Sequence, residues 1–484
     1  MNILYLNPDQ MRADFLGCYG HPVSRTPNID RLAAEGTRFA QCHAQHTVCT
    51  PSRCSFMTGW YPHVRGHRTL GNPLRADEPN TLRYLRQAGY EVHWSGKNDL
   101  LAPEAFEHSV TRLHLPKPGS TGDRGIFPKE DPGYWSFLYG PMEGHHTDWH
   151  IVEGAVDFLR SRKEGDAPFM LYLPLDLPHA PFTCPRPWYD FYDPDSMDAM
   201  RPADLPGKPA FYRWIREYRQ LDKLDPAVLR KIRAVYLGMI AYVDAMVGRI
   251  LDVLETTGLA ENTAVFLFSD HGEWAGDFGL VEKWHSALDD CLTRVPMIAR
   301  IPGGKAGQVV PEPVECFDIM PTTLELAGIE ARHTHFARSM LPQLRGEAGD
   351  PSRTVFAEGG YDPHEPHCFE GSPNDIAGQP DHVYYPKGKL QQDRPESSGR
   401  SVMARTASRK LIYRREGPSE LYDLEKDPGE LHNRYADPRY DNVRQELEGR
   451  LLDWYLHTSD VTPFDRQPRH YVEEVRRQFG QTIL

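Results

Sequence analysis

Cysteine is scarce in this sequence, and its cysteines lack the paired spacings that hold zinc or build a disulfide framework. The eight cysteines lie at positions 18, 42, 49, 54, 184, 291, 316 and 368, with no Cys-x-x-Cys pair among them. This pattern is typical of free thiols in a reducing compartment, of which the cytoplasm is the simplest. The start of the chain has no basic segment followed by an apolar run, so we expect no signal peptide.

Long hydrophobic runs and an excess of basic residues are missing as well. We find no apolar run long enough to span a membrane, and we therefore expect no membrane partner. The formal net charge is -13. Proteins that bind nucleic acid present a basic surface to the phosphates, so we expect no nucleic acid partner. A negative average still allows an anionic substrate, because a local cluster of Arg, Lys, His and metal can hold an anion.

The chain does contain an alternation of short apolar runs and helical patterns. With 484 residues it is too long for one ordinary core, and we expect two domains. Strand, helix and strand in series predict an α/β fold over residues 1–350, a mostly parallel sheet with helices on both faces. Short antiparallel strands, a long loop over 360–400 and a helix over 442–455 then predict a smaller α+β domain over 351–484.

Polar residues follow four of the predicted strands. These strands cover residues 2–6, 90–94, 169–175 and 263–268, and after them come Asp9-Gln10, Lys97, His179 and Asp270-His271, respectively. In open parallel sheets, ligands bind outside the carboxyl ends of the strands. The coincidence of four polar clusters at this edge predicts an active site there.

Asp9, Asp270 and His271 offer carboxylate and imidazole ligands from two strand ends. Such a set suits a divalent cation, with Ca2+ as the first expectation and Mn2+ as the second. Gln10 can add a neutral oxygen or contact the nucleophile. Ser-Asp-His-Gly alone fits an ordinary turn equally well, and the similarly placed Asp9-Gln10 favours the metal.

The segment Cys49-Thr-Pro-Ser-Arg53 places a cysteine in a fixed frame of proline and arginine. Such a frame can convert a thiol into an aldehyde, whose hydrate is a nucleophile, although a half-buried packing cysteine fits these five residues equally well. Arg53, Lys97 and Lys283 can each hold an oxygen of a tetrahedral oxyanion. His179 can donate a proton to a leaving oxygen.

Taken together and in order, the motifs of this chain resemble those of formylglycine-dependent sulfatases. They are Asp9-Gln10-x-Arg12-x-Asp14, Cys49-Thr-Pro-Ser-Arg53 with Thr58-Gly59, Ser95-Gly96-Lys97, Pro178-His179-Ala180-Pro181, Ser269-Asp-His-Gly-Glu273, Gly276-Asp-Phe-Gly279 with Lys283, and Glu420-Leu-Tyr-Asp-Leu424. The resemblance spans nearly the whole chain, and the joint match is highly specific.

The resemblance implies an alkaline-phosphatase-like fold with a smaller C-terminal domain. It implies that a separate formylglycine-generating enzyme oxidises Cys49, and that the hydrated aldehyde attacks the sulfur of a sulfate ester. The implied metal ligands are Asp9, Gln10, Asp270, His271 and the modified Cys49. The implied sulfate contacts are Arg53, Lys97 and Lys283, with His179 assisting the leaving alcohol.

Two further readings stay open because the chain departs from the common pattern. Gln10 and His271 replace the Asp and Asn of many members, as in a branch that includes choline sulfatase and the phosphonate monoester hydrolases. A phosphonate monoester hydrolase or phosphodiesterase with the same nucleophile is therefore the alternative, which Asn72 favours and Lys97 opposes. A degenerate binding protein is the other alternative, and the intact set of site residues argues against it.

Substrate contacts are predicted next to the matched motifs. His67, Arg68, Asn72 and Asp99 are the candidates, and Asp99 stands where many sulfatases have a histidine. A second group of histidines can line a pocket for a sulfated sugar, or can equally be solvated loop residues: His145 and His146 with Asp148, His285, His364 and His367. The sequence makes no prediction of oligomeric state.

Overall fold

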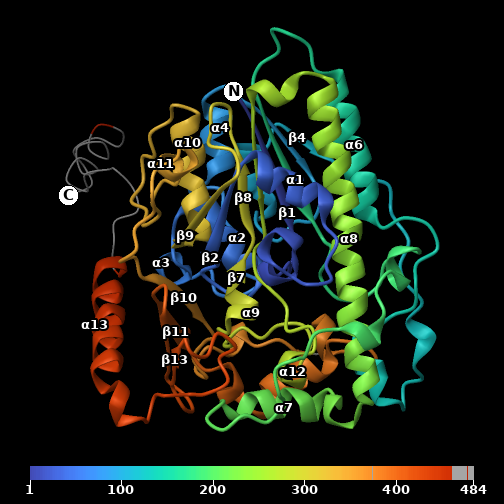
Figure 1. The fold of residues 1–484 in the computed structure, drawn as a ribbon, viewed down its shortest axis with the longest axis vertical. Helices are drawn as coiled ribbons and strands as arrows, with labels where there is room; N and C mark the ends of the chain where they lie inside the picture. Colours follow the sequence, from blue (N-terminus) through green and yellow to red (C-terminus); the bar gives the residue numbers. More distant parts are fainter. Residues whose placement is uncertain (373, 460–476, 478–484) are drawn as a thin grey trace.

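The large sheet runs through the centre of the protein (Figure 1). The computed structural model describes residues 1–372, 374–459 and 477. In these residues one sheet has nine strands in the order β4-β3-β5-β1-β6-β8-β2-β7, with β9 paired to β2. Their bounds are β1 (Asn2–Pro8), β2 (Thr37–His43), β3 (Glu91–Ser95), β4 (Arg112–His114), β5 (Phe169–Leu175), β6 (Thr263–Phe268), β7 (Arg294–Val295), β8 (Met297–Arg300) and β9 (Gln308–Glu315).

The middle strand, β1, is apolar almost throughout and buried along its whole length. It pairs in parallel with β5 on one side, where Leu4 lies opposite Leu171, and with β6 on the other, where Leu4 lies opposite Val265. A strand covered on both faces reads as a continuous apolar run, which explains why the period-two pattern is missing here. The predicted mostly parallel sheet is confirmed, with β8 as an antiparallel neighbour of β6.

Two layers of helices cover the sheet, and alternate residues of β1 divide between them. Leu4 and Leu6 pack in one core with α1 (Pro27–Glu35), α6 (Thr147–Ser161), α7 (Ala210–Tyr218) and α8 (Pro226–Thr256). Ile3 and Tyr5 pack in a second core with α2 (Cys49–Thr58), α4 (Thr81–Gln87), α10 (Ile319–Leu326) and α11 (Leu341–Leu344). Successive side chains of a strand point to opposite faces, so one short strand contributes to both cores. Short helices α3 (Pro62–Arg65), α5 (Phe106–Ser109) and α9 (Asp290–Thr293) lie in the connections.

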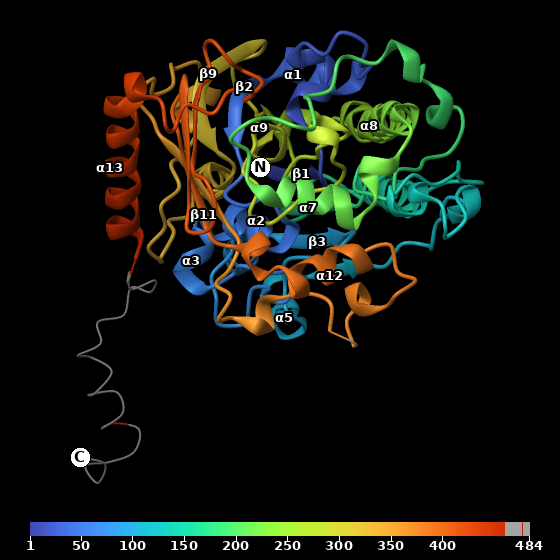
Figure 2. The same ribbon diagram turned by 90° about the horizontal axis from the view of Figure 1, so that it is seen from below.

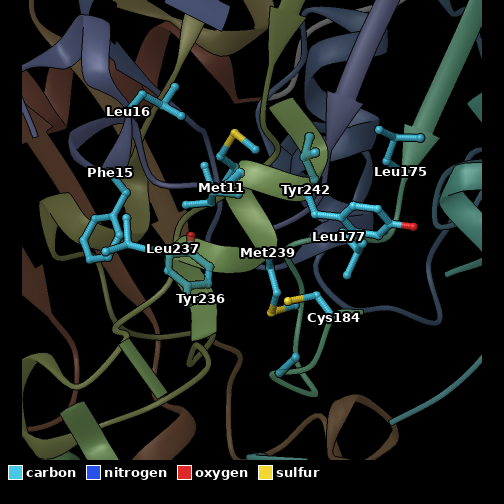
Figure 3. Packing of buried hydrophobic residues seen from close by; sticks show 14 of the residues in the cluster. Met11, Phe15, Leu16, Leu175, Leu177, Cys184, Tyr236, Leu237, Met239 and Tyr242 are labelled. Atoms are coloured by element: carbon cyan, nitrogen blue, oxygen red, sulfur yellow. The ribbon is translucent and has the colours of Figure 1, made fainter. Parts of the chain in front are cut away.

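Helix α8 is the main packing element on the first face. Figure 3 shows Tyr236, Met239 and Tyr242 of α8 among Phe15 and Leu175 of the core. By length and composition α8 could cross a membrane, so the expectation that no apolar run reaches that length was wrong. In the folded protein 89% of the most apolar window of this helix is buried. Its hydrophobicity therefore serves the core, as the stripe of apolar residues predicted.

A second, antiparallel sheet follows in the order β10 (Val355–Gly359), β11 (Ser401–Arg405), β12 (Arg409–Arg414) and β13 (Glu420–Asp423). Helix α13 (Asp441–Thr458) packs against this sheet, and its Leu447, Leu451 and Trp454 belong to the same core as Ile3 and Tyr5. The domain boundary at residue 350 stays a prediction. The predicted loop over 360–400 is partly wrong, because it contains α12 (Tyr385–Asp393), which packs against α7 (Figure 2).

Candidate active site

The structure brings the four polar clusters together at one edge of the sheet. Strands β3, β5, β1 and β6 are consecutive neighbours and mutually parallel, so their carboxyl ends lie side by side. Lys97 follows β3, His179 follows β5, Asp9 follows β1, and Asp270 follows β6. The turn after β3 needs a glycine, because Gly96 has a φ of 142° and an added Cβ would lie 2.2 Å from the carbonyl oxygen of Pro174.

Cys49 enters this edge as the first residue of helix α2. Pro51 lies in the first turn, where backbone N–H groups have no partner within the helix. The N–H that proline lacks is therefore not needed there. Arg53 follows Cys49 by four residues, so both side chains lie on the same face of the helix. The Cys-x-Pro-x-Arg spacing is thus a helical spacing, which sequence reasoning did not recognise. The hydroxyl of Ser52 donates to the carbonyl of Asp270 at 2.6 Å and fixes α2 to the end of β6.

Four buried side chains form a candidate metal centre: Asp9, Cys49, Asp270 and His271, whose ligand atoms all lie within 4.8 Å of one another. The thiol Sγ of Cys49 lies 3.2 Å from Nε2 of His271 and 3.7 Å from Oδ1 of Asp9. Carboxylate oxygens and an imidazole suit a hard or borderline divalent cation, so the donor set fits Ca2+ or Mn2+.

Gln10 is not placed among these four ligands. Its Oε1 accepts a hydrogen bond from Nζ of Lys283 at 2.7 Å, and its Nε2 donates to Glu273. The amide oxygen keeps a second lone pair, so these contacts leave the ligand role of Gln10 a prediction. The backbone N–H of Gln10 donates to Asp270 at 3.1 Å.

Arg53 lies behind the metal centre and bridges its two carboxylates. Its Nη2 lies 3.0 Å from Oδ2 of Asp9, and its Nε lies 2.9 Å from Oδ2 of Asp270. Burial opposes ionisation of Asp9, but the cations Lys97 and Arg53 outweigh it and hold the pKa of Asp9 well below its usual range. In this geometry Arg53 positions the two carboxylates, and the sulfate contact that the resemblance implied for it stays a prediction.

Lys97 marks the mouth of the site. Its Nζ lies 2.9 Å from Oδ2 of Asp9, 3.0 Å from Asp99 and 3.3 Å from Asp176. Burial disfavours its charge, but Asp9 outweighs this and the pKa of Lys97 is raised well above its usual value, so the ammonium persists. Asp99 therefore lies at the site, as predicted for a substrate contact. The nearby His146 has its Nε2 3.8 Å from Asp176.

Lys283 and His179 form a hydrogen-bonded pair, with Nζ and Nε2 separated by 2.6 Å. Nδ1 of His179 lies 2.6 Å from the carbonyl oxygen of Ala180, so Nδ1 carries the proton and Nε2 accepts from the Lys283 ammonium. Burial and the charge of Lys283 lower the pKa of His179 well below its usual value, which keeps the ring neutral. The proton available for transfer is therefore the one on Nζ of Lys283 that is donated to Nε2 of His179.

Three of the predicted substrate contacts have other partners in the structure, and their roles toward a substrate stay predictions. The ring of His67 lies between the carbonyl oxygen of Asn72, at 2.7 Å from Nδ1, and the carboxylate of Glu78, at 3.2 Å from Nε2. Arg68 forms a bidentate pair with Glu365. The side chain of Asn72 accepts from Thr69. In the described part of the chain, none of the three contacts the metal centre or Lys97.

The second group of histidines divides in the same way. His145 bonds Tyr242 and stacks on Trp149, whereas His285 is buried and stacks on Tyr361. His364 and His367 are exposed on the surface. Of this group, His146 is the one whose contacts reach the mouth of the site. Sequence reasoning also missed Tyr384, which lies within electrostatic range of both Lys97 and Lys283, because the predicted loop carried no motif.

The fold and the buried centre define a class, an alkaline-phosphatase-like hydrolase. A family model described as Sulfatase matches residues 1–329. The chain therefore belongs to the sulfatase family, enzymes that hydrolyse sulfate esters.

Individual relatives agree. The protein named as an uncharacterized sulfatase, YidJ, of Escherichia coli strain K12 is 29% identical over 94% of this chain and 86% of its own length. An N-acetylglucosamine-6-O-sulfatase of Bacteroides thetaiotaomicron is 26% identical over 96% of this chain and 88% of its own. The crystal structure of a phosphonate monoester hydrolase of Agrobacterium radiobacter superimposes with a TM-score of 0.74 at 23% identity, covering 94% of this chain and 96% of that one. This last likeness shows a shared fold.

Metal binding is predicted to stabilise the protein through Asp9 and Asp270. With Ca2+ or Mn2+ at a hundred times its dissociation constant, we expect chelator-treated protein to gain about 2.7 kcal/mol in free energy of unfolding. Urea denaturation with and without metal measures this gain. Asp270→Asn should abolish most of it, whereas Asp252→Asn, at an exposed position of α8, should keep it. An equal gain in both variants would show that the metal binds elsewhere.

Protonation of His67 is predicted to stabilise the protein at neutral pH. Burial opposes its charge, but contacts with Cys54 and Glu78 outweigh it and raise the pKa of His67 to about 10. Because the folded pKa exceeds the unfolded value of about 6.5, the contribution is complete below pH 6.5 and is lost as the pH rises toward 10. The difference in free energy of unfolding between wild type and His67→Gln should therefore shrink from a few kcal/mol at pH 6.5 to near zero at pH 10. His364→Gln is the control, and a difference that does not change with pH would contradict the assignment.

Proposed function

We propose that this enzyme hydrolyses a sulfate ester on a sugar, with a formylglycine derived from Cys49 as its nucleophile. The observation that carries the proposal is the place of Cys49: its Sγ lies in the buried cluster with Asp9, Asp270 and His271. As an ordinary thiol it is a poor nucleophile here, because burial and the charge of Asp9 raise its pKa well above the usual value. An aldehyde hydrate needs no thiolate.

The proposed hydrolysis takes place at residue 49 in steps that conserve all atoms. Water adds to the aldehyde to give a hydrate, one of whose oxygens attacks sulfur while the bond from sulfur to the leaving oxygen breaks. The second hydroxyl then loses its proton and re-forms the carbonyl, and the carbon–oxygen bond to sulfate breaks. The net reaction consumes one water and gives an alcohol and sulfate. A divalent metal held by Asp9, Asp270, His271 and residue 49 supplies Lewis acidity at this centre.

The cations around the centre bind the sulfate, supply a proton to the leaving oxygen and position the carboxylates. Lys97 and Lys283 face the centre from two sides and can hold the sulfate oxygens, because each keeps its charge in a buried setting. The proton shared between Lys283 and His179 can pass to the leaving oxygen as its bond to sulfur breaks. Arg53 keeps the two carboxylates apart and ionised while the charge on the substrate shifts.

A sugar is the proposed carrier of the sulfate because relatives along the whole chain include an N-acetylglucosamine-6-O-sulfatase. The part-exposed carboxylates Asp99 and Asp176 at the mouth can accept hydrogen bonds from hydroxyl groups. The modification of Cys49 requires a formylglycine-generating enzyme as a partner in the cell.

The mass of the peptide that contains Cys49 tests the nucleophile. Active enzyme should carry a residue about 18 Da lighter than cysteine at position 49. Trypsin separates Cys49 from Cys54 at Arg53, so the next peptide is an internal control that should keep its thiol. Cys49→Ala should lower kcat by about 10^4 or more, as expected for loss of a nucleophile, while Cys18→Ala should not. Full activity with an unmodified or absent Cys49 would refute the mechanism.

The alternative substrate is a phosphonate monoester or phosphodiester, which the fold shared with a phosphonate monoester hydrolase favours. Lys97 at the mouth favours sulfate. We expect an aryl sulfate or a sugar sulfate to be hydrolysed with a kcat/KM at least tenfold above that of the matching aryl phosphonate and phosphodiester, a difference of about 1.4 kcal/mol in transition-state binding. Turnover of the phosphorus esters with no turnover of either sulfate would reverse the assignment.

A further inference from the structure

Arg219 is a buried cation that forms no ion pair with a carboxylate of the described residues. It follows the last residue of α7 and is 3% exposed. Its guanidinium lies over the ring of Phe137 at 4.0 Å, and its Nη1 donates one long hydrogen bond of 3.4 Å to the carbonyl of Val281. Its Nε and Nη2 have no hydrogen-bond partner among the residues that the structure describes. Burying a guanidinium in this way is costly unless a partner compensates, which points to an anion that binds there.

Arg219 lies beside the catalytic lysine. Val281, which it contacts, precedes Lys283 by two residues, and both cations act on the carboxylate of Glu282 between them. Glu282 already pairs with Lys283, whose Nζ lies 3.1 Å from its Oε1. Among the described residues the ion pair of Glu282 is with Lys283, whereas Arg219 forms no ion pair, although the carboxylates of Glu282 and Glu273 both act on its charge.

Lys387 adds a third cation around the same carboxylate. It is 5% exposed, and its nearest carboxylate is that of Glu370, at 3.6 Å. Burial opposes ionisation of Glu282, but Lys387, Lys283 and Arg219 outweigh it and hold its pKa well below the usual range. In the proposed reaction Lys97 and Lys283 hold the reacting sulfate, so the edge of Arg219 formed by Nε and Nη2 keeps no hydrogen-bond partner among the described residues.

Tyr384 connects this region with the reacting centre. Its ring packs on Phe137, the residue under Arg219, with the centroids 5.0 Å apart. Burial and Glu282 raise its pKa, against the opposing charges of Lys283 and Lys97, so the phenol is protonated and close to both lysines. No described residue forms a hydrogen bond with its hydroxyl, which leaves one donor free beside the centre.

We propose that Arg219, with Lys387 and Tyr384, binds a second anionic group on the sugar that carries the reacting sulfate. The group is a planar or tetrahedral oxyanion, a carboxylate or another sulfate, because a guanidinium edge with two free N–H positions matches paired oxygens. The inference rests on the proposed function and names its substrate class: sugars with two anionic groups.

Matched substrate pairs test this subsite. N-acetylglucosamine 6-sulfate is compared with glucosamine 2-N,6-O-disulfate, and a neutral sulfated disaccharide is compared with one that contains a uronic acid. In wild type we expect kcat/KM to be at least tenfold higher for one of the doubly anionic sugars, and the pair that shows the difference identifies sulfate or carboxylate. Arg219→Gln should remove most of this preference, chiefly through KM, and Arg219→Lys should restore part of it.

Controls separate the possible failures. Arg213→Gln, exposed on the same helix and paired with Glu217, should behave as wild type. Equal kcat/KM within both pairs in wild type, or an equal loss on all sugars in Arg219→Gln, would overturn the proposal. If Arg219→Gln does not fold, Lys387→Gln and the wild-type preference decide the question. If no sulfate ester reacts, the proposed function fails instead, and calorimetric binding of the same pairs still measures the preference.

Discussion

The site depends on the bridge that Arg53 forms between Asp9 and Asp270. Two buried carboxylates side by side repel each other and lose their hydration, so they stay ionised only with a cation between them. The guanidinium does this with two fixed nitrogens, at 3.0 Å and 2.9 Å from the two Oδ2 atoms. Each carboxylate then keeps its Oδ1 within 4 Å of His271. A lysine would offer one point charge and could not fix this separation.

The bridge exists because of the strand order. Asp9 and Asp270 end two parallel neighbours, β1 and β6, and α2 brings Arg53 across both ends. The apolar run of β1 is buried on both faces, so its register is fixed and its last residues cannot slip relative to β6. The lysine after β3 reaches the same carboxylate from the other side of β5. The contacts that stabilise the sheet therefore also fix the geometry of the site.

Sequence reasoning predicted that the polar clusters meet at one edge of the sheet, and the structure brings them together there, because strand ends leave a strong local signal. An apolar run followed by Asp9 or by Asp270-His271 places these residues once the strands are known to be parallel. It could not predict that Gln10 contacts Lys283 or that Arg53 bridges Asp9 and Asp270, since residue type does not determine which partner a side chain meets. Arg219 was missed because it lies far along the chain from Tyr384 and Lys387, and none of the three belongs to a motif. Their proximity results from the packing of α12 on α7.

The reacting centre and the segment beside it are held in place in different ways. The centre is built on strand ends in the interior, where any displacement disturbs the core. Tyr384 and Lys387 belong to the segment between β10 and β11. Contacts such as the ion pair of Arg68 with Glu365 hold this segment in place. Connecting segments tolerate changes in length and composition that strands do not. One fold can therefore carry different substrate contacts around the same centre, and in the subsite proposed above those contacts are the charges that lie beside Lys283.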